Sequence, residues 1–239
     1  MQGLLQLIQD RQSTRGPYDP KRSVPRQDII QIMEAGRWAP TAHNMQNFEI
    51  IVVDDKKLLK AIGDIKSPMS ETFIQENYQQ LSSSEEELLQ KKVGVLATMF
   101  PVFMRNPGAK LDKATGEQLA AFQSRLIQTS SALLIVLYDP VKRAPASEGD
   151  FLGIISLGCV MENMWLMANS LGIGFHVVSA ISAPPVAKEI VNLLHIPKNF
   201  QIAFSARLGY SAGPVKYLRV RRDIRDFTHL NSFGSKGLE

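Results

Sequence analysis

The chain is poor in the residues that build covalent and metal-bound scaffolds. Cys159 is the single cysteine among 239 residues, so the sequence excludes an internal disulfide and a metal site made of cysteines. The four histidines show no spacing typical of metal ligands, and we expect no metal. No basic stretch followed by an apolar run marks a secretory signal, so we expect a cytoplasmic protein.

Long apolar runs are also scarce, and residues 150–170 form the exception. This run is long enough to suggest a membrane span, but Glu162, Asn163 and Asn169 interrupt it. We expect instead a central helix that is covered on most sides, and no membrane association. The chain also has no repeat, no low-complexity linker, and no obvious catalytic triad or pair of carboxylates.

The net charge of +4 is unevenly distributed. Residues 11–26 hold five basic residues and one acid, and so do residues 216–225. A nucleic-acid groove is one interpretation, but such grooves usually interleave aromatic and basic residues over a broader surface. Two small clusters that converge on one phosphate group fit better, so we expect no nucleic-acid partner.

Helical and strand patterns alternate without a regular β-α-β rhythm, which predicts an α+β fold. We expect a single domain over residues 1–239, with an irregular segment at about 66–115. Strands are predicted at 48–53, 132–138 and 201–209, the last with Ile202, Phe204, Ala206 and Leu208 on one face. Helices are predicted at 4–10, 28–39, 54–65, 150–170 and from about 184, and residues 117–130 form a polar amphipathic segment. Ser84 and Glu87 have capping-box spacing, which predicts a further helix that runs until Pro101.

The stretch RQSTRGP, which begins at Arg11, is a candidate anion site. In an extended chain Arg11, Ser13 and Arg15 share one face, and the guanidinium fork matches phosphate geometry. A solvated N-terminal arm is the alternative. Arg219 and Arg221 alternate in the same way near the other end of the chain.

Several motifs in order resemble the FMN-dependent nitroreductase family. They are RQSTR at 11–15, RWAPT at 37–41 and NMQNF at 44–48, followed by similar stretches at 171–181, 195–210 and 219–229. The resemblance covers nearly the whole chain except about 66–115, the region that shapes the substrate site in this family. Asn47 and Phe48 depart from the family's usual Pro-Trp, and Val178, Ser179 and Ala180 depart from the Ile-Glu-Gly of some members.

The resemblance implies a central, mostly antiparallel sheet flanked by helices, in an intertwined homodimer with FMN at the subunit interface. It implies that residues 11–15 hold the phosphate, ribityl and pyrimidine end of FMN, and that Arg219 and Arg221 complete the phosphate site. Asn44 and Gln46 would contact the ring and ribityl chain, although they could instead only cap the turn before the strand. The expected FMN contacts are Arg11, Gln12, Ser13, Arg15, Pro40, Thr41, Asn44, Gln46, Val177, Val178, Ser179, Ala180, Arg219 and Arg221.

The implied reaction is two-electron ping-pong transfer, in which NAD(P)H reduces FMN and a nitroaromatic, quinone or related small molecule is reduced in turn. The flavin carries the chemistry, so no catalytic side chain is required, and Arg15 matches the position beside flavin N1. Another flavin reaction (heterocycle oxidation or reductive dehalogenation) and a non-enzymatic flavin binder are the alternatives. Phe100, Phe103 and Met104 are expected to form an apolar flap over the flavin, or else to be ordinary core or dimer contacts.

Overall fold

The computed structural model describes residues 3–66, 82–99, 113–145, 149, 151–213 and 218–236. The chain divides into two compact units: Met1–Ser67 with Gln118–Pro214, and Pro68–Glu117 with Val215–Glu239. The single domain expected for residues 1–239 stays a prediction.

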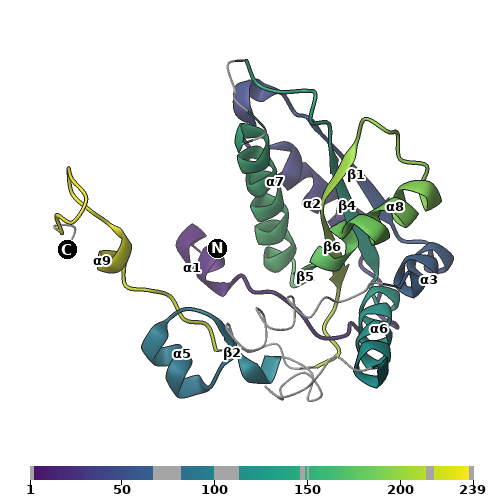
Figure 1. The fold of residues 1–239 in the computed structure, drawn as a ribbon, viewed down its shortest axis with the longest axis horizontal. Coiled ribbons are helices and arrows are strands. Elements are labelled where there is room, and N and C mark those ends of the chain that lie inside the picture. The colour runs from purple at the N-terminus through teal and green to yellow at the C-terminus, as the bar shows by residue number, and fades with distance from the viewer. Residues whose placement is uncertain are drawn as a thin grey trace. The chain divides into compact units, whose positions relative to one another are not determined.

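A four-stranded sheet forms the centre of the first unit (Figure 1). Its strands are β1 (Phe48–Val53), β4 (Ala132–Tyr138), β6 (Gln201–Gly209) and β5 (Gly174–Val177), which lie side by side in that order. Every neighbouring pair is antiparallel, which confirms the predicted α+β class and the antiparallel sheet. Three of these strands match the predicted ranges. The short edge strand β5 was not predicted, because four residues that begin with a glycine carry too little pattern.

Helices cover both faces of this sheet. Their bounds are α1 (Leu4–Asp10), α2 (Arg26–Arg37), α3 (Lys56–Asp64), α6 (Lys113–Gln128), α7 (Phe151–Ser170) and α8 (Pro184–Leu193), with short 3-10 helices η1 (Ala42–Asn44) and η5 (Ser179–Ser182). Asp55 caps α3 by accepting from two N–H groups, and prolines begin α8, where a missing N–H costs nothing.

Strand β4 explains why two cores form. Its residues alternate across the pleat, so Leu134 and Val136 face α2 and α7, whereas Leu133 and Ile135 face α3 and α8. All of β4 except its last residue, Tyr138, is buried, since both faces of this central strand are covered.

A bulge between β4 and β6 corrects one prediction. Val136 pairs with Phe204, but Leu137 pairs with Ile202, so Ala203 is passed over in the register. An extra residue on one strand reverses the faces beyond it. Ile202 therefore packs with the core under α3 and α8, while Phe204 packs on the opposite face. The prediction that both share one face was wrong.

Helix α7 has the predicted length but is not covered on most sides. Its buried stripe, Ser156, Leu157, Val160, Met164 and Ala168, packs toward α2 and the sheet. Phe151 and Ile154 are 69% and 59% exposed. Within the described ranges, α7 is the helix long and apolar enough to cross a membrane, a test that core helices of soluble proteins also pass. The expected cover is missing because α1, α2 and the sheet leave the side of α7 that bears Phe151 and Ile154 exposed.

In the second unit, the predicted capping box is confirmed. Ser84 and Glu87 exchange hydrogen bonds at the start of α5 (Glu85–Lys91). The helix does not continue to Pro101: it ends at Lys92, in the left-handed region at φ 53°, and Gly94 follows at φ 108°. The short strands β2 (Ser82–Ser83) and β3 (Val95–Leu96), η3 (Ala97–Met99) and α9 (Ile224–Phe227) also lie in this unit. Phe100, Phe103 and Met104 lie outside the described residues.

Candidate cofactor site

The N-terminal segment, residues 11–18, lies along the free edge of β5. Ser13 forms a parallel bridge with Phe175, and the Thr14 N–H donates to the Phe175 carbonyl at 3.0 Å. Thr14 is buried, so the alternation of an extended chain turns Ser13 and Arg15 toward the opposite side. This pairing fits the extended segment that the sequence predicts, and the segment is not a solvated arm in this part of the structure.

Arg11 is held against helix α7. Its Nε lies 3.1 Å from a Glu162 carboxylate oxygen, and its guanidinium lies over the Trp165 ring, 4.4 Å from the ring centroid. The Trp165 Nε1–H donates to the Gln12 carbonyl at 3.1 Å, and the Trp165 ring stacks on Phe175. The segment is therefore fixed on two sides, by the edge strand and by α7. Sequence reasoning gave neither residue a role: Glu162 was noted only as a polar interruption of the apolar run, and Trp165 resembled an ordinary member of an apolar helix.

Arg207 on β6 holds the other end of this segment. Its Nη2 donates to the carbonyls of Thr14 at 3.2 Å, Arg15 at 3.4 Å and Gly16 at 2.7 Å. The Arg207 side chain is fully buried, and its guanidinium lies over the Tyr18 ring. Sequence reasoning gave Arg207 no role. The available signal was a charged residue in the middle of a strand whose neighbours are apolar.

His176 lies next to Arg207 and stays neutral. The Arg207 Nε–H donates to His176 Nδ1 at 3.1 Å, so the neutral ring carries its proton on Nε2. Burial lowers the pKa of His176 well below its usual value of 6.5, and the charges of Arg207 and Arg15 lower it further. The Arg15 guanidinium is thus within electrostatic reach of β5. Burial also lowers the pKa of Arg207, which remains a cation.

The chain from Val177 to Ala180 follows directly on His176. Val177 ends β5, and Val178 is bound to β6, because its N–H donates to the Ser205 carbonyl and its carbonyl accepts from the Ser205 hydroxyl, both at 2.9 Å. Ser179 and Ala180 begin η5. The first N–H groups of a helical turn need acceptors from outside it, so these two residues are the better placed donors for a cofactor.

The turn that contains Thr41, Asn44 and Gln46 lies against α7, since the Ala42 N–H donates to the Ser156 hydroxyl at 3.0 Å. The Gln46 N–H donates to the Thr41 hydroxyl at 3.2 Å, and the Gln46 side chain donates to the Asn44 side chain at 3.0 Å. These bonds are the ones expected if Asn44 and Gln46 only cap the turn before β1. The side chains of both residues nevertheless remain exposed to solvent. Asn44 and Gln46 have φ of 52° and 43°, an uncommon conformation that often marks functional turns. Pro40, just before this turn, is exposed.

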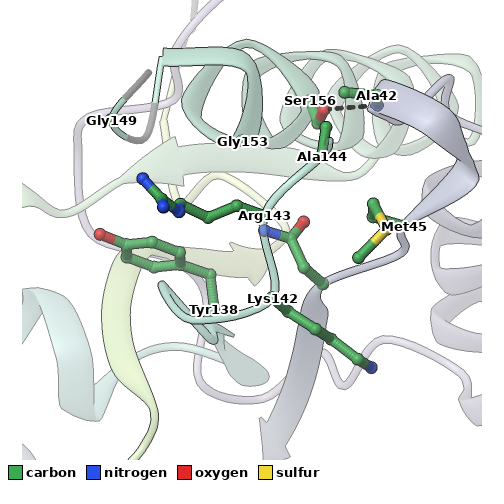
Figure 2. Close-up of a pocket in the computed structure, with 10 residues that line it drawn as sticks. Ala42, Met45, Tyr138, Lys142, Arg143, Ala144, Gly149, Gly153 and Ser156 are labelled. Atoms are coloured by element: carbon green, nitrogen blue, oxygen red, sulfur yellow. Dashed lines mark hydrogen bonds between the residues drawn. The ribbon is translucent and has the colours of Figure 1, made fainter. Parts of the chain in front are cut away.

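A small pocket lies beside this turn and does not include the expected FMN contacts. Figure 2 shows it between the turn, the end of β4 and the first residues of α7, with Ser156 bonded to Ala42. Its lining is Ala42, Met45, Asn47, Tyr138, Lys142, Arg143, Ala144, Gly149, Gly153 and Ser156. None of the residues that line this pocket belongs to the N-terminal segment, so Arg11 and Arg15 do not line it.

Two cationic groups predicted to share one site belong to different units. Arg11 and Arg15 lie in the first unit, whereas Arg219 and Arg221 lie in the second, where both are exposed. The Arg221 Nη1 donates to the neighbouring Val220 carbonyl. Their convergence on one phosphate stays a prediction.

Comparison with known proteins found a matching family model and solved structures of the same fold. A model of the nitroreductase family matches residues 8–210. A nitroreductase with bound FMN from Bacteroides fragilis has 18% identity and a TM-score of 0.58, and covers 96% of this chain and 100% of its own. An FMN-dependent nitroreductase from Clostridium difficile has 16% identity and a TM-score of 0.57, with the same coverage of 96% and 100%. A nitroreductase-like protein from Bacillus cereus has 15% identity and a TM-score of 0.61, with 96% of each chain covered. The comparison with curated proteins found no match.

Proposed function

The chain belongs to the nitroreductase family, and from this premise we propose that it is an FMN-dependent oxidoreductase. The observation that carries the proposal is the pairing of the N-terminal segment with β5 through Ser13 and Phe175. This pairing sets the segment that bears Arg11 and Arg15 beside the chain that leads to Ser179 and Ala180. Two stretches separated by about 160 residues of sequence, each expected to bind flavin, therefore meet at one sheet edge.

The donor set fits FMN. Arg11 and Arg15 are cations suited to a phosphate and to the electron-rich end of the ring, and Ser13 adds a hydroxyl donor on the same face. Glu162 lies beside Arg11, with a carboxylate oxygen 3.1 Å from Nε, so it orients the guanidinium that is proposed to bind the phosphate. Arg219 and Arg221 are proposed to complete the phosphate site, and Pro40, Thr41, Asn44 and Gln46 to contact the ring and ribityl chain.

FMN, when bound, would accept a hydride from NAD(P)H and pass the electron pair to a small acceptor such as a nitroaromatic or a quinone. NAD(P)H is supported by the likeness in fold to a protein from Clostridium acetobutylicum provisionally assigned as an NADH oxidase, with 16% identity, a TM-score of 0.60, and 95% and 99% of the two chains covered. The protein's own residues bind and orient the flavin. No side chain is proposed to transfer a proton.

We propose that the protein is a homodimer, with α7 in the interface. Phe151, Ile154, Ile155 and Gly158 follow helical spacing and form one exposed stripe on α7. Helix α1, which packs against α7, exposes Leu4 and Leu5 as well. An obligate interface resembles a core that has been cut in half, and this face has that composition. A helix buried in this way is consistent with a cytoplasmic protein.

Purification followed by flavin analysis tests the function. The protein is expected to bind FMN with a flavin absorbance spectrum, and the bound flavin is expected to bleach when NADH or NADPH is added without oxygen. Addition of a quinone or nitroaromatic should restore the oxidised spectrum in a separate step. Flavin bleaching without reoxidation by any acceptor would favour another flavin reaction. Flavin that no nicotinamide reduces would favour a flavin binder or a different reductant.

A further inference from the structure

Arg207 is a buried cation that binds no carboxylate in the part of the chain that the structure describes. Its exposed fraction is 0%, and its neighbours along β6 are Ala206 and Leu208. Within the ranges that the structure describes, no carboxylate lies at ion-pair distance from it. A buried guanidinium is costly, and an apolar side chain would fill this position in the sheet more cheaply. The fold alone therefore does not explain an arginine here.

The donors of Arg207 bind main-chain and imidazole acceptors. Nη2 is shared among three successive carbonyls of the N-terminal segment, and Nη1 donates to the Leu126 carbonyl at the end of α6. Nε donates to His176 Nδ1. Nε, Nη1 and Nη2 of Arg207 each donate a hydrogen bond, so the guanidinium is hydrogen-bonded without a negatively charged partner.

The acceptors belong to both stretches that the proposed function assigns to the flavin. The carbonyls of Thr14, Arg15 and Gly16 fix the main chain that carries the Arg15 side chain. His176 lies one residue before Val177, the start of the stretch that leads to Ser179 and Ala180. One side chain therefore ties the two stretches to each other at the sheet edge.

We propose that Arg207 is a positioning residue of the flavin site, which fixes the main chain of Arg15 and the end of β5 in the geometry that binds FMN. This inference rests on the proposed function. Lysine cannot replace it, because a single ammonium on a flexible stem cannot reach His176 and the carbonyls of the N-terminal segment together. Neutral His176 is the matching acceptor, since a protonated ring would have no lone pair for the Arg207 Nε–H.

The test compares Arg207→Lys with wild type, Tyr18→Phe and Ile190→Ala. Tyr18→Phe removes a hydroxyl that donates to the Arg207 carbonyl at 3.3 Å and keeps the ring over which the guanidinium lies. Ile190→Ala weakens the core on α8 and changes no donor or acceptor of Arg207. For each protein, the FMN dissociation constant is measured by flavin fluorescence, and the midpoint potential is measured with FMN saturating. Arg207→Lys is expected to bind FMN at least tenfold more weakly, and to shift the potential because Arg15 moves, whereas both controls keep the wild-type values.

Arg207→Lys that folds, binds FMN within twofold of wild type and keeps the same potential would overturn the proposal. If Arg207→Lys does not fold, variants of its acceptor His176 test the proposal instead. His176→Leu removes the acceptor and should weaken FMN binding at least threefold, whereas His176→Gln offers an oxygen and should stay within twofold of wild type. Equal dissociation constants for wild type and both variants would overturn it. Wild type that binds no FMN would reject the proposed function itself, and with it this role.

Discussion

Arg207 and His176 lie on adjacent strands, and the Arg207 Nε–H donates to His176 Nδ1 at 3.1 Å. Because burial and the charges of Arg207 and Arg15 lower the pKa of His176 well below 6.5, the folded protein keeps this ring neutral at pH values where the unfolded chain protonates it. The bond therefore links folding to pH.

The first prediction concerns that link. Below the unfolded pKa of 6.5 the unfolded state binds one more proton at His176 than the folded state, so the free energy of unfolding falls as pH decreases. The loss approaches about 1.4 kcal/mol per pH unit until the folded pKa is reached. Urea unfolding at a series of pH values from neutral to mildly acidic measures it. His176→Gln should show a shallower dependence, and an identical slope in the two proteins would contradict the assignment.

The second prediction concerns the exposed stripe of α7. Ile154→Glu places a charge on a face that we expect to be buried in the dimer, and a two-fold interface contains the residue twice. Burying each isoleucine contributes roughly 1.5–3 kcal/mol, so the variant should dissociate into monomers and lose FMN if the cofactor lies at the interface. Sedimentation velocity gives the oligomeric state. Val141→Glu changes an equally apolar, exposed side chain in the loop after β4 and should remain dimeric. If the wild-type protein is a monomer, the prediction that α7 forms a dimer interface is wrong.

The third prediction concerns the phosphate. Arg11→Ala or Arg221→Ala should weaken FMN binding by about 1.5–3 kcal/mol, the range for hydrogen bonds to charged groups. Riboflavin lacks the phosphate, so it should bind more weakly than FMN and be insensitive to Arg221→Ala. Lys57→Ala, which removes an exposed cation on α3, is the control for net charge. Calorimetric titration of both flavins into the apoprotein decides the matter. Equal affinities for FMN and riboflavin would refute the phosphate site.

The parts of the fold that the sequence predicted are those with a strong local cause. The apolar runs of β1 and β4, the capping box at Ser84, and the prolines before Val186 each act over a few residues, and each is confirmed. The bulge that moves Ile202 to the other face depends on the partner strand, so no pattern within 201–209 reveals it. The same holds for the exposure of α7, because an apolar helix looks alike whether its partner is the same chain or another.

The candidate site divides in the same way. The alternation of Arg11, Ser13 and Arg15 is local, and it predicted an extended segment. In the structure, this segment pairs with β5 through Ser13 and Phe175. The bonds from Arg207 to that segment join residues that are more than 190 positions apart in the chain, and only the folded sheet brings them together. Glu162 likewise needed the position of α7 before it could be assigned to Arg11.

The last prediction is that Arg15 sets the redox potential of the flavin as well as holding it. Reduction places negative charge on the N1 side of the ring, so a cation there stabilises the reduced form more than the neutral oxidised form. Arg15 lies beside β5, the edge strand next to which the flavin is proposed to bind: its carbonyl accepts from Arg207 Nη2 at 3.4 Å, and its charge contributes to the lowered pKa of His176.

Arg15→Gln removes the charge and keeps a hydrogen-bond donor. The loss of a charged contact worth about 1.5–3 kcal/mol should lower the midpoint potential by tens of millivolts, because about 30 mV corresponds to roughly 1.4 kcal/mol for a two-electron couple. Arg11→Gln is the matched control: Arg11 lies against Glu162 and Trp165 and is proposed to bind the phosphate, away from N1, so its loss should weaken FMN binding with a much smaller shift in potential. Spectroelectrochemical titration of both variants, saturated with FMN, measures the two effects separately. If Arg15→Gln has the wild-type potential, the charge does not act at N1, and Arg15 serves only to bind the cofactor.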